Sequence, residues 1–234
     1  MSEILIGGIE KREILIVDYD PRWLEKFHHH AAIISRALGP KALLIEHIGS
    51  TSVPDLAAKP IIDIDVLVQD SSNEDAYLPD LLTAGYILRV REPDWHEHRM
   101  FRTPGLDVHV HIFSPGCEEV ARHLTFRNRL RSHTEDRLRY EALKRKLAKE
   151  DWADTNAYAR AKSELVEEII AQALQNTFVG LLSPQLPHNV PFALSCYRIV
   201  PPLIADLPTA YAWLTAKKEA YAEASFPPRT PRHP

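Results

Sequence analysis

Residues 45–68 read IEHIGSTSVPDLAAKPIIDIDVLV and carry the clearest structural signal in the chain. The run from Ile61 to Val68 is apolar apart from two aspartates, which is the pattern of a buried strand. Because side chains alternate between the two faces of a strand, Asp63 and Asp65 point to the same side. The opposite face must pack into the core, and it consists of Ile62, Ile64, Val66 and Val68.

The paired carboxylates of Asp63 and Asp65 are candidate metal ligands and catalytic groups. Two neighbouring carboxylates stay ionised together only if a cation lies between them or if water reaches them. A hard divalent ion such as Mg²⁺ or Mn²⁺ prefers carboxylate oxygens. The alternative interpretation is the solvent-exposed polar face of an edge strand.

The segment before this strand has the composition of a phosphate-binding turn. Glycine allows a close approach of the backbone, and free N–H groups with hydroxyls bind oxyanions. Lys59 adds a positive charge near this turn. A plain strand-to-loop turn is the alternative. The candidate phosphate-binding residues of the turn are Gly49, Ser50, Thr51 and Ser52.

A second polar strand is expected at residues 107–113. Asp107, His109 and His111 alternate onto one face of the segment DVHVHIF, and valine and isoleucine residues fill the other. Imidazole is a poor ligand for Mg²⁺ and a better one for Mn²⁺ or Zn²⁺, and it also serves as a general base near neutral pH. His109 and His111 are therefore candidate catalytic residues.

The remaining pattern predicts an α+β (mixed α/β) fold with a small mixed sheet flanked by helices and a helical C-terminal half. The Asp20-Pro21 pair begins a helix that ends at Gly39-Pro40. The other expected strands cover residues 43–48, 86–90 and 98–102. The other expected helices cover residues 74–84, 118–131, 135–149 and 155–176.

Proline divides the chain into two predicted regions. Ten of the 18 prolines lie in the last 59 residues, where they prevent continuous helix or central strand. We therefore expect a folded domain at residues 1–176 and a proline-rich extension at 177–234 that is partly docked, with a disordered end.

Composition narrows the class of protein. The formal charge of −4 excludes a general polyanion binder, but residues 121–149 hold ten basic and three acidic side chains, a local charge of +7. Such a basic helical segment suits a substrate with several phosphates or an RNA end, although a solvated helical face is the alternative. Two distant cysteines and no apolar run of the roughly 20 residues that span a bilayer favour a cytoplasmic protein.

The string at 45–68 closely resembles the GrpB family of the polymerase-β-like nucleotidyltransferase superfamily, and the resemblance extends over residues 14–175. Asp55 stands where the family usually has glycine, and Asn128 where it usually has aspartate. In that superfamily the Gly-Ser turn holds nucleotide phosphates and the two aspartates share one or two Mg²⁺ ions, with a third carboxylate on a neighbouring strand. Other matching segments are Tyr19–Trp23, Gly85-Tyr86, Arg99–Phe101, His109–His111, Phe126–Arg131, Tyr140, Leu143-Lys144, Tyr158 and Lys162.

The resemblance implies a metal-dependent transferase of the nucleotidyltransferase type, in which Lys59, Arg127 and Arg131 bind phosphate. Some fungal relatives instead suggest synthesis of arginine-containing cyclic dipeptides from aminoacyl-tRNA. In that reaction a histidine or Glu46 would be the base, and the aspartates would bind a guanidinium group. A non-catalytic module that binds nucleotide or RNA is the third hypothesis. The expected partners are thus a nucleotide or aminoacyl-tRNA, and the sequence indicates neither a membrane nor a protein partner.

Overall fold

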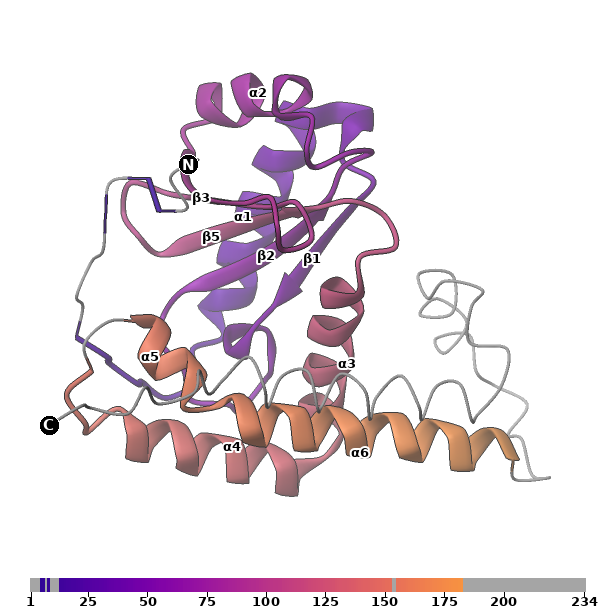
Figure 1. The fold of residues 1–234 in the computed structure, drawn as a ribbon. Coiled ribbons are helices and arrows are strands. Elements are labelled where there is room, and N and C mark those ends of the chain that lie inside the picture. Colours follow the sequence, from indigo (N-terminus) through magenta and orange to yellow (C-terminus); the bar gives the residue numbers. More distant parts are fainter. Residues whose placement is uncertain (1–4, 7, 9–12, 153–154, 183–234) are drawn as a thin grey trace, which may run out of the picture. The chain divides into compact units, whose positions relative to one another are not determined.

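The computed structural model describes residues 5–6, 8, 13–152 and 155–182, and these residues build a mixed sheet with helices around it (Figure 1). The strands lie in the order β1-β2-β5-β4-β3. All neighbours are antiparallel except β2 and β5, which run parallel. The strands are β1 (Leu44–Ile48), β2 (Ile62–Leu67), β3 (Ile87–Glu92), β4 (His98–Arg102) and β5 (Val108–Phe113). The α+β class and the mixed sheet expected from the sequence are confirmed.

One face of the sheet forms the main core. The apolar residues of β2 and β5 that alternate with the polar ones have no exposed surface: Ile62, Ile64, Val66, Val108, Val110 and Ile112. Helices α1 (Arg22–Leu38) and α2 (Leu78–Thr83) pack against them. α1 begins where the Asp20 carboxylate accepts the Arg22 backbone N–H at 2.9 Å, and it buries Trp23, Ile34 and Leu38.

The other face carries the polar side chains. In the register of the sheet, Asp63 lies opposite His109, and Asp65 lies between Glu46 and His111. Residues directly opposite each other project from the same face. The helices on this side are α3 (Glu118–Ser132), α4 (Thr134–Leu147), α5 (Thr155–Arg160) and α6 (Ser163–Leu182).

A second core joins these helices to the segment after β1. Val53 and Leu56, which follow the Gly-Ser turn, pack with Leu130 of α3, Tyr140 of α4 and Ile169 of α6. This packing places α4 and α6 beside one another (Figure 1).

Two helices differ from the sequence prediction. The helix expected at 74–84 is a 3₁₀ turn (Glu74–Ala76) followed by α2, because Pro79 lacks an N–H and fits only a first helical turn. The helix expected at 155–176 is interrupted at 161–162, between α5 and α6, and α6 continues to Leu182. Of the predicted extension, residues 183–234 lie outside the described part. Within the described part, no helix combines the length and apolarity needed to cross a bilayer.

Candidate functional site

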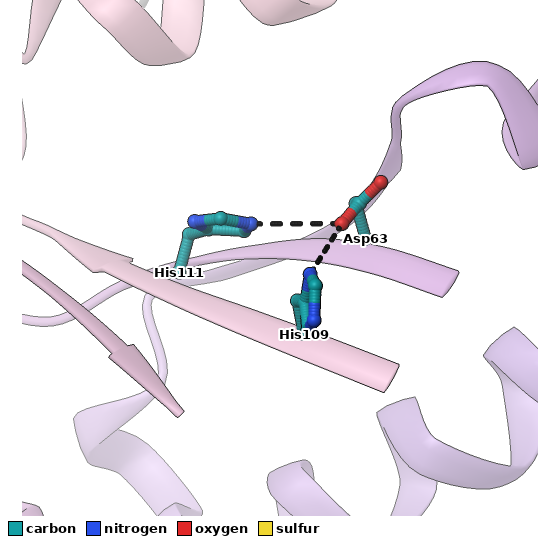
Figure 2. A group of neighbouring side chains, drawn as sticks. All are labelled: Asp63, His109 and His111. Atoms are coloured by element: carbon teal, nitrogen blue, oxygen red, sulfur yellow. Dashed lines mark ion pairs between the residues drawn. The ribbon is translucent and has the colours of Figure 1, made fainter. Parts of the chain in front are cut away.

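Asp63 is the centre of a three-residue cluster on the polar face of the sheet. Its Oδ1 atom lies 3.2 Å from Nδ1 of His109 and 3.8 Å from Nε2 of His111. Figure 2 shows both imidazole rings, from neighbouring strand β5, pointing at this one oxygen. Between a fifth and a third of each side chain is exposed, so a small ion or substrate can reach the cluster.

The donor set of this cluster fits a divalent metal ion. One carboxylate oxygen and two imidazole nitrogens lie within 4.8 Å of one another, close enough to share one ion. Burial alone would raise the pKa of Asp63, but its polar contacts with His109 and His111 outweigh burial and lower that pKa. The carboxylate is therefore ionised and available as a ligand. Two histidines with one carboxylate suit Mn²⁺, Fe²⁺ or Zn²⁺ better than Mg²⁺.

Asp65 points to the same face as Asp63, but it pairs with His123 of α3 rather than with the cluster. Its side chain is fully buried, and Oδ2 accepts a hydrogen bond from Nδ1 of His123 at 2.9 Å. Burial would lower the pKa of His123, yet Asp65 and Glu119 raise it to about 10, so this histidine is a cation. Oδ1 of Asp65 has no hydrogen-bond partner among the described residues. The structure thus brings His109 and His111, rather than Asp65, into the cluster around Asp63.

The Gly49 turn lies against Asp63. Gly49 has φ 68° and ψ −175°, and a Cβ atom at this position would lie 2.6 Å from Oδ2 of Asp63. Ser52 and Thr51 close the turn by donating hydrogen bonds to the carbonyls of Gly49 (2.6 Å) and Ile61 (3.0 Å). Glycine is therefore required both for the backbone conformation and for the close approach of the aspartate.

A cavity of about 170 Å³ opens between this turn and the helical half. One wall consists of Gly49, Ser50, Thr51, Asp63 and His109. The other polar and aromatic lining side chains, here called the basic wall, are Lys59, Tyr140, Lys144, Tyr158 and Lys162. Three lysine side chains and one carboxylate therefore line the same small space, and the lysines in their protonated form favour an anionic ligand.

The three lysines are held by aromatic rings. The Nζ atoms of Lys59 and Lys162 lie 5.1 and 4.6 Å from the centroid of the Tyr158 ring. Nζ of Lys144 lies 4.8 Å from the Tyr140 ring and donates to Ser50 Oγ at 3.0 Å. Burial lowers the pKa of Lys144 to about 7 and that of Lys162 to about 8. An anion in the cavity would restore their charge.

Three residues predicted for the site do not line the cavity: Glu46, Arg127 and Arg131. Arg127 is buried, and its Nη1 donates to Glu46 Oε2 at 2.6 Å and to the His47 carbonyl at 2.8 Å. Arg131 donates to the Ser52 carbonyl at 3.0 and 2.7 Å. Both arginines therefore fix the backbone around the Gly-Ser turn, and neither lines the cavity.

Sequence reasoning gave no role to four residues of the basic wall: Tyr140, Lys144, Tyr158 and Lys162. They belong to the stretches that match the family, but lysines in a charged helix look like a solvated surface. The sequence does place Lys144 one turn after Tyr140 on the same helical face, and this spacing is the signal that could have linked the two residues. Nothing local distinguishes Lys162, whose position depends on the break between α5 and α6.

Comparison with known proteins agrees with this architecture. The family model described as "GrpB protein" matches residues 13–172. A UPF0157 protein of Halalkalibacterium halodurans is 48% identical over 74% of this chain and 90% of its own length. The crystal structure of GrpB from Enterococcus faecalis superimposes with a TM-score of 0.63 and 34% identity, covering 70% of this chain and 99% of that one. A dephospho-CoA kinase of Mycolicibacterium paratuberculosis is 28% identical over 66% of this chain, but over 44% of its own length.

Proposed function

This chain belongs to the GrpB family, and we propose that it is a metal-dependent transferase of the nucleotidyltransferase type that acts on a phosphate-bearing substrate. The observation that carries the proposal is the cavity itself, which is lined by two members of the Asp63 cluster, by the Gly49 turn and by three lysines. Such a cavity can hold a phosphate chain in two ways. The carboxylate and imidazoles would hold a metal ion that binds some phosphate oxygens, and the lysines would bind the remaining oxygens.

Each wall of the cavity has a distinct part in this proposal. Asp63, His109 and His111 would hold one divalent ion, for which their two imidazoles favour Mn²⁺ over Mg²⁺, and the ion would neutralise charge on the reacting phosphoryl group. Lys59 and Lys162 would bind the phosphate oxygens that lie farther from the ion. Tyr158 supports a polar ligand, because it lines the cavity and its buried hydroxyl has no hydrogen-bond partner within the described ranges. The partial match to dephospho-CoA kinases is compatible with a phosphate-bearing substrate.

Binding of pyrophosphate tests the basic wall without knowledge of the acceptor. We expect the full-length chain to bind sodium pyrophosphate in the presence of Mn²⁺ by calorimetry, and K162M to weaken binding about tenfold or more, the value of one charged hydrogen bond. The matched control is K146M, because Lys146 is exposed on α4 and does not line the cavity. Equal affinity of K162M, K146M and the wild type would contradict the proposal.

Asp63→Asn tests the metal side and separates the competing reactions. An amide is a much weaker ligand for a divalent cation, so Mn²⁺ affinity and any release of pyrophosphate from nucleoside triphosphates should fall together, and EDTA should abolish the reaction.

A second candidate is cyclic dipeptide synthesis from arginyl-tRNA, favoured by the partly exposed Asp63 carboxylate in the cavity, which could bind a guanidinium group. In that case EDTA would leave product formation unchanged, while Asp63→Asn would weaken recognition of the arginyl substrate. Binding of nucleotide or RNA without any turnover under either condition would instead identify a non-catalytic module.

A further inference from the structure

His111 does not stand alone but ends a chain of hydrogen bonds that starts outside the candidate site. Nδ1 of His98 lies 2.8 Å from Oε2 of Glu92, and Nε2 of His98 lies 3.0 Å from Nδ1 of His111. The two imidazole planes differ by only 16° with ring centroids 5.2 Å apart, so their hydrogen bond lies nearly in the plane of both rings. β3, β4 and β5 thus contribute one link each.

The packing around His98 fixes this chain in place. His98 is 5% exposed, its ring stacks on Phe113 at 4.8 Å, and Trp95 meets it edge-on at 5.2 Å. A ring enclosed on several sides by aromatic groups keeps one orientation. Its two nitrogens therefore remain directed at the Glu92 carboxylate and at His111.

A doubly protonated His111 would donate from both nitrogens and could not bind a metal ion. With a neutral His111, two proton arrangements satisfy these contacts. Since an ionised carboxylate accepts hydrogen bonds and does not donate, Nδ1 of His98 carries a proton in both. If His98 is neutral, its Nε2 accepts and Nδ1 of His111 donates, so Nε2 of His111 keeps a free lone pair. If His98 is doubly protonated, a positive charge is buried among aromatic rings and His111 carries its proton on Nε2. Burial disfavours the charged ring.

The neutral arrangement has a consequence for Asp63. It directs the lone pair of His111 Nε2 and the carboxylate oxygen of Asp63 at each other across 3.8 Å. Two electron-rich atoms at this separation need a cation between them, and 3.8 Å lies within the span of two ligands of one ion whose bonds are each about 2 Å long.

We propose that Glu92 and His98 are positioning residues that hold His111 in the Nδ1–H tautomer and so present its Nε2 atom to a transition metal ion, Mn²⁺ or Zn²⁺, together with Asp63 and His109. This inference rests on the metal site of the proposed function, but not on the identity of the substrate. A ligating histidine whose second nitrogen donates to a fixed acceptor is the usual way in which proteins orient imidazole toward a metal.

The test uses the full-length chain and the metals alone. Long-range ¹H–¹⁵N spectra of ¹⁵N-histidine-labelled protein report the tautomer of each ring, and calorimetry with Zn²⁺ and Mn²⁺ reports affinity. We expect His111 to be an Nδ1–H tautomer in the wild type. His98→Phe keeps the aromatic packing but removes the acceptor, so His111 should shift toward the Nε2–H form and metal affinity should fall about 10- to 100-fold.

Two further variants keep the result interpretable. Glu92→Leu leaves the buried His98 ring in place but removes the acceptor of its Nδ1–H group, so the proton of His98 is free to move to Nε2. This variant should therefore change the His111 tautomer in the same direction, even if His98→Phe folds poorly. His30→Phe is the matched control, because His30 also makes a ring-nitrogen hydrogen bond, to the Tyr86 hydroxyl at 2.9 Å, on the other side of the sheet. It should leave the tautomer of His111 and the affinity for metal unchanged.

The possible failures can be told apart. A wild type that binds metal while His98→Phe and Glu92→Leu bind it equally well would overturn the positioning role and leave the metal site intact. An Nε2–H signal for His111 in the wild type would overturn the role by establishing the charged arrangement of His98. A wild type that binds neither Zn²⁺ nor Mn²⁺ would overturn both this inference and the metal site, whereas pyrophosphate binding would still report on the basic wall.

Discussion

Replacing Gly49 by alanine would test how tightly the Gly49 turn is coupled to the Asp63 cluster. The added Cβ would lie 2.6 Å from Oδ2 and 3.2 Å from Cβ of Asp63, where ordinary contact begins at 3.4 Å. The carboxylate would therefore have to retreat by about 0.8 Å. Metal ligands tolerate shifts of only about 0.2 Å, so Mn²⁺ affinity should fall more than about tenfold.

The same substitution also strains the backbone. A φ of 68° with a ψ of −175° is a conformation that glycine alone adopts readily, and alanine there should lower the free energy of unfolding by about 1–3 kcal/mol. The control is Gly116→Ala, because Gly116 has φ 82° but no atom within 4 Å of an added Cβ. It should share the loss of stability without the loss of metal affinity.

Urea unfolding and Mn²⁺ calorimetry on the two full-length variants measure both effects. We expect the two variants to be destabilised to a similar extent and only Gly49→Ala to lose metal affinity. If Gly49→Ala binds Mn²⁺ as tightly as Gly116→Ala does, the contact between the turn and Asp63 does not set the geometry of the cluster, and the reasoning is refuted.

Three other substitutions give distinct outcomes. Arg127→Met should lower the free energy of unfolding by about 1–3 kcal/mol in urea titrations, because it removes charged hydrogen bonds to Glu46 and to the backbone. Lys144→Met should flatten the pH dependence of stability, because burial lowers the pKa of Lys144 to about 7 in the folded wild type. Between pH 7 and about 10 the unfolded wild type therefore binds a proton that the folded state does not. The stability of the wild type should rise over this range relative to that of the variant. A parallel rise in both proteins would contradict this. Tyr158→Phe removes a buried hydroxyl without a described partner, so thermal melts should show no loss of stability, while pyrophosphate affinity should fall if the hydroxyl contacts the ligand.

The sheet could be predicted from the sequence because its signals are local. Alternation alone put Asp63, His109 and His111 on polar faces, and the apolar residues between them are buried as expected. Alternation could not decide between Asp65 and the histidines as partners of Asp63. That choice depends on His123 of α3, which neutralises Asp65 from a distant part of the chain.

The helical wall of the cavity could not be predicted for a related reason. Lys144 and Lys162 become site residues only through the packing of α4 and α6 against the segment after β1. Asp55 shows the opposite case, in which the structure explains a sequence departure. Its φ of 63° is the left-handed conformation that glycine adopts freely and aspartate tolerates, and its side chain is exposed away from the cavity lining.

The pairing of β2 with β5, the last strand of the sheet in the sequence, determines at which stage of folding the candidate site can form. β5 inserts between β2 and β4, so it completes the sheet only after the intervening strands have been made. Asp63 precedes His109 by 46 residues, so the three members of the cluster come together only once β5 has been made. Closing so long a loop costs entropy before any contact is gained. An ion held by the proposed cluster would therefore bind only to the completed sheet, and it would stabilise the folded chain by mass action.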